Sequence, residues 1–213
     1  MLSIILPLIM YLFPNIQAQL LHKNEAVLST HEISLNNRYP NQSVNEVFKE
    51  NILLNLAYLR GSIALRKPIV WSRIKEPFTY SLILKPGDVF AFHDDVLPDF
   101  NTGKIKTTNA HFNSSEGFKS DGYLVGDGVC HLASLMYWVA KDANITSQAP
   151  TNHDFANIPE DPREFGVSIY HAPGEKTANE QQNLYIKNDK NKPIAFVFSY
   201  ENDRLQVAVK ELL

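Results

Sequence analysis

The chain has 213 residues, of which 44% are hydrophobic and 20% are charged. These proportions are those of an ordinary globular protein, not of a disordered or fibrous one. The formal net charge of −3 provides no basic surface for nucleic acid, so we expect no nucleic-acid partner.

The N-terminal 18 residues differ in composition from the rest of the chain. Residues 2–13 are apolar with one exception and carry no charge, and a Pro-Asn pair and small residues follow them. This pattern is typical of a signal-peptide core and is short for a bilayer span. We predict that residues 1–18 are a signal peptide or a short membrane anchor of an exported, cell-envelope protein. The alternative is a buried N-terminal strand or helix.

A helix is expected in the first third of the chain. Residues 19–42 are polar and weakly periodic, which favours a linker or extension. Ser43 and Glu46 have the spacing of a capping box, so a helix should begin after Ser43. Apolar residues then recur at helical spacing as far as Leu59, and Gly61 is a plausible C-terminal stop.

Short strands and a long loop are expected next. Residues 69–71 read as a short strand, and a Pro-Gly turn separates expected strands over 80–84 and 89–92. Residues 93–117 are rich in Asn, Thr, Ser and Asp, which predicts a long loop. Such a loop is either functional or a disordered insertion.

The C-terminal part reads as β-structure that follows a buried helix. Residues 132–140 are apolar on nearly every side, as in a helix that is buried all round. Four strands are expected, over 167–170, 184–187, 193–200 and 205–210. A tight turn over 201–204 should join the last two. The predicted fold class is α+β, with a buried central helix that opens with Cys130 and packs on a mainly antiparallel C-terminal sheet.

Cys130 is the only cysteine in the chain, and it follows a glycine-rich turn. A thiol at a helix N-terminus faces unsatisfied N–H groups and the positive end of the helix dipole. Such a position favours the thiolate and can lower the pKa of a cysteine. In an exported protein a lone thiol is a candidate nucleophile or an intermolecular partner. The alternative is that Cys130 is a small apolar residue packed at the start of a core helix.

A cysteine nucleophile needs a base that can also stabilise the thiolate. His153, in a loop after the helix, is the preferred base, and His171, at the end of an expected strand, is the alternative. His131 is adjacent to Cys130 and is included in the catalytic set, although neighbours on a helix diverge by about 100°. Asp94 and Asp95 are among the residues that could orient an imidazole.

Oxyanion stabilisation and substrate binding require further donors. The expected set is the Cys130 N–H together with Gly128, Ser134, Asn152 and His171. No phosphate-binding glycine loop and no His-Glu-x-x-His motif is present, so we predict neither a cofactor nor a metal. A zinc site formed by Cys130, His153 and His171 is a weaker alternative.

Three segments, Leu84–Phe92, Gly126–Ser134 and Tyr170–Gly174, together resemble motifs of the VanW family of bacterial envelope proteins. Leu84–Phe92 is similar to that family's Leu-x-Pro-Gly-Glu-x-Phe-Ser-Phe segment. Gly126–Ser134 resembles its Gly-Gly-Gly-Ile-Cys-Gln-Val-Ser-Thr motif, and His153 falls where the family has a His-Ser pair. Tyr170–Gly174 resembles its Tyr-x-x-x-Gly. The resemblance covers about residues 44–213, and we assign a VanW-like domain to 43–213.

The resemblance implies an activity on peptidoglycan. Some members of the family are implicated as L,D-transpeptidases, and members occur in glycopeptide-resistance clusters. By that resemblance Cys130 would form a thioester with a peptidoglycan stem peptide and pass it to an amine of a neighbouring stem. The family's Asp-Ala-Thr is replaced by Glu-Lys-Thr-Ala over 175–178, so no acidic third triad member is identified. The alternatives are a non-catalytic peptidoglycan-binding module and a thiol endopeptidase or amidase.

Overall fold

The computed structural model describes residues 25–63, 68–123 and 125–213. The expected leader over residues 1–18 lies outside these ranges. None of the helices within them has the length and apolarity that a bilayer-spanning helix needs.

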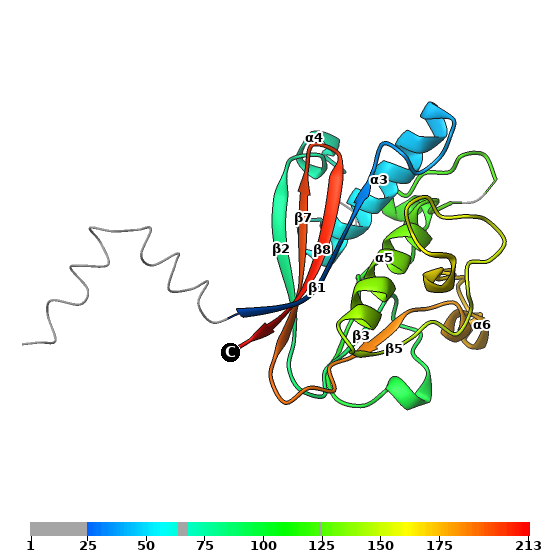
Figure 1. Ribbon diagram of the computed structural model, residues 1–213. Coiled ribbons are helices and arrows are strands. Elements are labelled where there is room, and N and C mark those ends of the chain that lie inside the picture. Colours follow the sequence, from blue (N-terminus) through cyan, green and yellow to red (C-terminus); the bar gives the residue numbers. More distant parts are fainter. Residues whose placement is uncertain (1–24, 64–67, 124) are drawn as a thin grey trace, which may run out of the picture.

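A four-stranded antiparallel sheet forms one side of the fold (Figure 1). Its strands, in spatial order, are β1 (Glu25–Ser34), β8 (Arg204–Leu212), β7 (Ile194–Glu201) and β2 (Phe78–Leu84). Alternate residues of β7 and β8 are buried on the same face of the sheet, as the period-2 pattern of their sequences predicts. That face supplies a large part of the hydrophobic core.

The hairpin between β7 and β8 confirms the predicted turn. Glu201 pairs with Arg204, and the two residues between them have positive φ, 50° at Asn202 and 58° at Asp203. Two central residues in this conformation make a type I′ turn, which matches the twist of the flanking strands. Asn and Asp are among the residues that adopt this conformation most readily.

Residues 25–34, which we expected within a linker, form the edge strand β1 instead. β1 pairs with β8 along its whole length, from Glu25 opposite Leu212 to Ser34 opposite Arg204. Its pattern of exposure alternates only weakly, and Val27 is exposed. The sequence signal is weak because an edge strand that is exposed on one side has few apolar positions.

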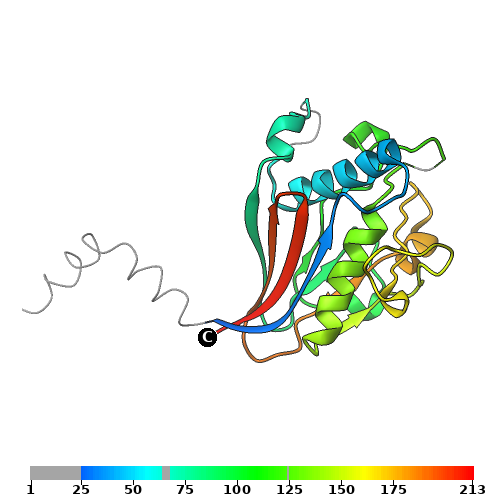
Figure 2. The same ribbon diagram turned by 45° about the horizontal axis from the view of Figure 1, so that its top comes forward.

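A second, smaller sheet lies on the other side of the fold and is visible behind the helices in Figure 2. Its order is β4 (Ile105–Lys106), β3 (Val89–Ala91), β6 (Tyr185–Lys187) and β5 (Thr146–Gln148). The β3–β4 pair is parallel and the other two pairs are antiparallel.

The long helix α3 (Gln42–Leu59) begins two residues earlier than expected. The side chain of Asn41 caps it by accepting hydrogen bonds from the N–H groups of Ser43 and Val44. Ser43 is therefore inside the helix and does not act as its N-cap. The predicted stop at Gly61 is confirmed: Gly61, with φ 66°, donates to Tyr58 as in a Schellman motif.

Helix α5 (Val129–Asp142) contains Cys130 as its second residue, after the N-cap Gly128. It contacts β1 and β8 of the first sheet, β5 of the second sheet, and α3. Most of its residues are buried, as the apolar run predicts. The α+β fold class with a largely antiparallel C-terminal sheet is confirmed.

Residues 167–171, which we call the wall segment, are not a strand, contrary to the prediction for 167–170. Two of their N–H groups bond to side chains of α5: Val167 to Ser134 Oγ at 2.9 Å and Ile169 to Cys130 Sγ at 3.4 Å. The N–H groups of Ser168 and Tyr170 bond to separate loops. The segment is apolar because it packs on α5, and it forms no ladder because its partners are not a neighbouring strand.

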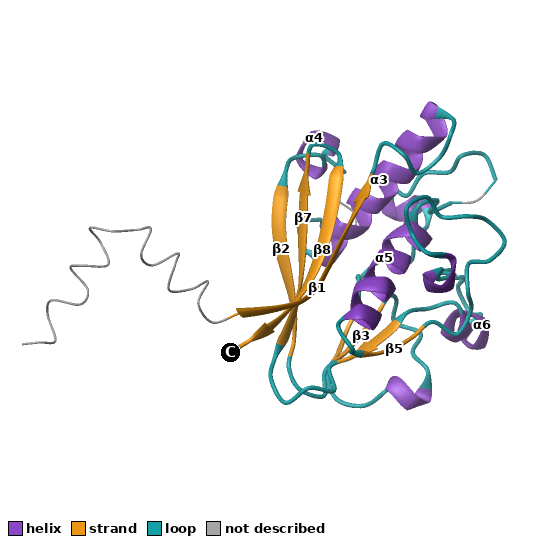
Figure 3. Cartoon of the chain, viewed as in Figure 1, coloured by secondary structure: helices purple, strands orange, loops and turns teal. Residues whose placement is uncertain are grey.

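The connections carry short helical turns (Figure 3). Residues 69–71, expected as a strand, lead into the short helix α4 (Trp71–Ile74). The loop 93–117 is confirmed as largely irregular and includes η1 (Pro98–Phe100) and η2 (Ser114–Glu116). The remaining elements are η3 (Arg163–Phe165) and α6 (Lys176–Gln181).

Ser134→Ala is expected to lower the free energy of unfolding by about 1–3 kcal/mol, because it leaves the buried N–H of Val167 without an acceptor. Ser72→Ala, at an exposed helical serine, is the matched control and should stay within about 0.5 kcal/mol of the wild type. Urea denaturation of the three proteins measures the difference. Equal stability of both variants would show that the bond to the wall segment contributes nothing.

Candidate functional site

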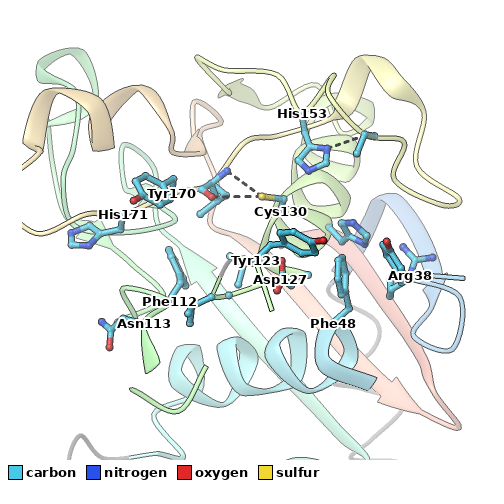
Figure 4. A pocket seen from close by; sticks show the side chains of 18 of the residues that line it. Arg38, Phe48, Phe112, Asn113, Tyr123, Asp127, Cys130, His153, Tyr170 and His171 are labelled. Carbon is cyan, nitrogen blue, oxygen red and sulfur yellow. Dashed lines mark hydrogen bonds between the residues drawn. The ribbon is translucent and has the colours of Figure 1, made fainter. Parts of the chain in front are cut away.

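Cys130 faces a pocket of about 470 Å³ (Figure 4). The wall segment forms one side, and the glycine-rich turn before α5 forms another. The remainder is lined by residues 111–114 of the long loop, by His153 and residues 155–157, and by Arg38, Tyr39 and Phe48. The pocket is large enough for part of a peptide.

Cys130 is only partly exposed, and its sulfur is held by the backbone of Ile169. The Ile169 N–H donates to Sγ at 3.4 Å, and the thiol donates to the Ile169 carbonyl at 3.6 Å. Both bonds are drawn in Figure 4. No imidazole of the described residues is hydrogen-bonded to Sγ.

The expectation of a lowered thiol pKa is wrong for this arrangement. Burial raises the pKa of the Cys130 thiol to about 11, and the charge of Asp127 adds to the rise, whereas the nearby backbone N–H groups oppose it. The rise from the ordinary 9.0 corresponds to on the order of 3 kcal/mol in favour of the protonated form. A helix N-terminus contributes about 0.3–2 kcal/mol, so burial outweighs the helix.

His131 also lines the pocket, and its ring centroid lies 6.3 Å from that of His153. It is buried, its ring lies 5.0 Å from that of Phe48 between centroids, and its Nδ1 has no hydrogen-bond partner among the described residues. Burial and the neighbouring charge of Arg38 lower the pKa of His131 well below its usual value. His131 is therefore a neutral, buried imidazole in the pocket wall and is not hydrogen-bonded to Cys130 Sγ.

His153 lines the same pocket as Cys130. Its Nδ1 lies 3.1 Å from the carbonyl of Ala156, which makes Nδ1 the protonated nitrogen and leaves Nε2 with a free lone pair. Burial lowers the pKa of His153, so the ring is neutral near pH 7. A neutral ring with a free nitrogen is suited to accept a proton.

His171 lines the pocket within a cluster of polar groups that lies away from His153 (Figure 4). Its ring centroid is 4.4 Å from that of His111, and its Nε2 lies 3.5 Å from Asp95. His111 in turn bonds Asp94 through Nε2 at 3.0 Å and Glu116 through Nδ1 at 3.1 Å. Asp94 and Asp95 thus each face an imidazole, as the sequence suggested, although neither faces His153.

The other expected donors are placed differently. Gly128 lines the pocket, with φ 94° at the N-cap of α5. Ser134 is fully buried, and its hydroxyl donates to the Cys130 carbonyl at 2.8 Å while accepting from Val167. Asn152 bonds the carbonyl of Arg163 and does not line the pocket. Of this set, the structure brings Gly128 and His171 to the pocket with Cys130.

The predicted alternative of a zinc site at Cys130, His153 and His171 is wrong. Within the described ranges, these three do not bring their ligand atoms together, whereas Asp94, His111 and His171 do. Sequence reasoning missed His111, which lies in the long loop 93–117, for which a functional role was one of the two expectations. It also missed exposed aromatic residues at the pocket rim, Tyr123 (93% exposed) and Phe155 (71%).

Gly128→Ala is expected to destabilise the protein by about 2–5 kcal/mol, because a Cβ would lie 2.6 Å from the Phe48 carbonyl oxygen and φ is positive. Gly174→Ala is the matched control: its φ is +85°, but a Cβ there meets nothing within 4 Å. That variant should lose only about 1–2 kcal/mol. Equal losses in urea denaturation would mean that the contact between Gly128 and α3 is not tight.

The alkylation rate of the thiol is expected to rise about tenfold per pH unit from neutral pH past pH 9, because only the thiolate reacts and the pKa is about 11. Since Cys130 is the only cysteine, iodoacetamide labelling followed by intact mass reports this site alone. The same protein unfolded in urea is the control and should level off above about pH 8.5. A plateau near pH 7 in the folded protein would contradict the raised pKa.

The comparisons with known proteins agree with the motifs. The family model described as "VanW like protein" matches residues 79–210, which is more than half of the chain and includes Cys130, His153 and the wall segment. No curated protein matches the chain, and no solved structure does. The chain belongs to the VanW-like protein family.

Proposed function

We propose that this protein is an exported cysteine acyltransferase that acts on peptidoglycan stem peptides, with Cys130 as the nucleophile and His153 as the base. The single observation that carries the proposal is that the only thiol of the chain lies at the start of α5 in the wall of a pocket. Membership of a family related to the cell envelope supports the class of substrate.

The charge state of the pocket determines how the thiol would be activated. The thiol is protonated and His153 is neutral at rest, so a preformed thiolate–imidazolium pair is disfavoured. The proton must therefore move to His153 Nε2 while sulfur attacks, as in general-base catalysis. A bound peptide would replace the bonds between Sγ and the Ile169 backbone and allow the side chain to turn toward His153.

The reaction proceeds in two acyl-transfer steps. Sulfur bonds to the carbonyl carbon of the stem's diamino acid, and His153 takes the thiol proton. The Cys130 N–H and the backbone beside Gly128 stabilise the oxyanion. The C–N bond to the terminal D-amino acid breaks, and the departing amine takes the proton from His153. A side-chain amine of a neighbouring stem then gives a proton to His153 and attacks the thioester, which releases the Cys130 thiol.

Hydrolysis follows the same first step, with water as the acceptor in place of the amine. The protein would then be a thiol endopeptidase or amidase. Exclusion of water from the thioester favours transfer over hydrolysis. The exposed rings of Tyr123 and Phe155 at the pocket rim are placed to cover a bound peptide.

A non-catalytic peptidoglycan-binding module is the second candidate. The observation that favours it is the protonated thiol, which is bonded to backbone and has no imidazole partner within the part of the chain that the structure describes. In that case Cys130 positions the wall segment, and the pocket binds a stem peptide without cleaving it.

Cys130→Ala is expected to abolish turnover of a tetrapeptide-bearing muropeptide, because the nucleophile is lost. His153→Gln should lower the rate about 10²–10⁴-fold. His31→Gln is the matched control, because His31 bonds Asp142 outside the pocket, and its rate should be unchanged. Mass spectrometry of the products and of a trapped thioester adduct on the protein measures all four proteins.

The outcomes separate the candidates. Full activity of Cys130→Ala excludes every mechanism through this thiol. Binding of purified sacculi by the wild type without any turnover supports the module. Release of the D-amino acid without a cross-linked product, in the presence of an amine acceptor, assigns hydrolysis in place of transfer.

A further inference from the structure

Two histidines and an aspartate converge at the edge of the pocket. One ligand atom from each of Asp94, His111 and His171 lies within 4.8 Å of the others. His111 comes from the long loop, and His171 ends the wall segment, so folding brings together residues that are 60 positions apart. The pair His111 Nε2 and Asp94 Oδ1 is already 3.0 Å apart.

We propose that Asp94, His111 and His171 bind one divalent transition-metal ion, for which Zn²⁺ is the probe. Two imidazoles and a carboxylate are a donor set that such ions prefer. With bonds of about 2.0–2.1 Å, two ligand atoms of a tetrahedral zinc site lie about 3.3 Å apart. The separation of 3.0 Å between His111 Nε2 and Asp94 Oδ1 is close to that value, and all the ligand atoms lie within 4.8 Å of one another, so side-chain movements alone can complete the site.

The groups around the cluster hold both imidazoles in place. The Glu116 carboxylate accepts a hydrogen bond from the backbone N–H of His111 at 2.8 Å, and its other oxygen lies 3.1 Å from His111 Nδ1. Its side chain is 6% exposed and closes the capping box of η2, so it is itself fixed. A carboxylate behind a ligating histidine sets the ring's orientation and raises its basicity.

The second ring has a similar support. Asp95 lies 3.5 Å from His171 Nε2, and Asn179 holds Asp95 by donating to it at 2.7 Å. His171 Nδ1 is buried and has no hydrogen-bond partner among the described residues. A buried polar nitrogen without a partner costs about 1–3 kcal/mol, and an ion bound by this ring would offset that cost.

The cluster is open to the pocket. His111 and His171 both line it together with Cys130, while Asp94 is exposed at the side. Three protein ligands leave at least one coordination position for an outside ligand. The ion would therefore act as a Lewis acid toward a carbonyl or carboxylate group of a molecule bound in the pocket. This site goes beyond the proposed acyl transfer, and its test needs no turnover.

The full chain, stripped with a chelator, is titrated with Co²⁺ followed by visible absorption, and with Zn²⁺ by calorimetry. We expect one ion per chain and two imidazoles coupled to bound Cu²⁺ in pulsed electron paramagnetic resonance. His111→Asn and His171→Asn should each weaken binding by more than about tenfold. Glu116→Gln should weaken it about 10–100-fold without removing a ligand.

Asp94→Asn distinguishes the loss of a ligand from misfolding, because Asp94 is exposed. This variant should bind Zn²⁺ more weakly, while the melting temperature of the metal-free protein stays unchanged. His31→Asn is the matched control: it removes another His–Asp pair outside the pocket and should leave binding unchanged. Cys130→Ser should also bind normally.

Two results overturn the proposal. One is equal Zn²⁺ affinity in the wild type and in the three variants Asp94→Asn, His111→Asn and His171→Asn, or no Zn²⁺ binding by any of these four proteins. The other is a sulfur-to-cobalt charge-transfer band in the near ultraviolet that disappears in Cys130→Ser, because it would place the ion at the thiol. Neither result bears on the acyl-transfer proposal, which the Cys130→Ala assay tests separately.

Discussion

The attachment of the wall segment to α5 is the constraint on which the site depends. Ser134 and Cys130 lie one helical turn apart, and their side chains accept the N–H groups of Val167 and Ile169, which are two residues apart. The face of a helix thus substitutes for a neighbouring strand. Each of these N–H groups would cost about 1–3 kcal/mol if buried without an acceptor, so the segment is held against the helix that carries the thiol.

This attachment explains the chemistry of Cys130. The Ile169 backbone is hydrogen-bonded to the Cys130 sulfur and also shields it from solvent. This burial raises the pKa of the thiol more than the helix N-terminus can lower it. The same contact gives Cys130 a structural role in the absence of a ligand: like Ser134 one helical turn further along, it holds the wall segment against α5. A nucleophilic role requires that a ligand displace the Ile169 bonds, so binding and activation would be the same event. The resting charge state therefore conflicts with a preformed thiolate but not with catalysis on binding.

Local signals predicted the parts of the fold that short-range physics decides. The Asn202–Asp203 turn, the stop at Gly61 and the buried face of β7 each follow from a few adjacent residues. The β1 strand was missed because its partner is at the other end of the chain and its pattern of exposure alternates only weakly. The wall segment was misassigned because apolar sequence reports burial but not the identity of the hydrogen-bond partner.

The candidate site shows the same division. Cys130 was identified because a lone thiol after glycines is a local signal, whereas His111 was not, since its neighbours Asp94 and Glu116 become its partners only on folding. The wall segment then joins both halves of the pocket: Ile169 contacts the thiol, and His171, two residues later, joins the imidazole cluster. Residues two apart on an extended chain point to the same side. The contact with the thiol and the imidazole cluster therefore depend on one short stretch of backbone, whose position the bonds to Cys130 and Ser134 fix.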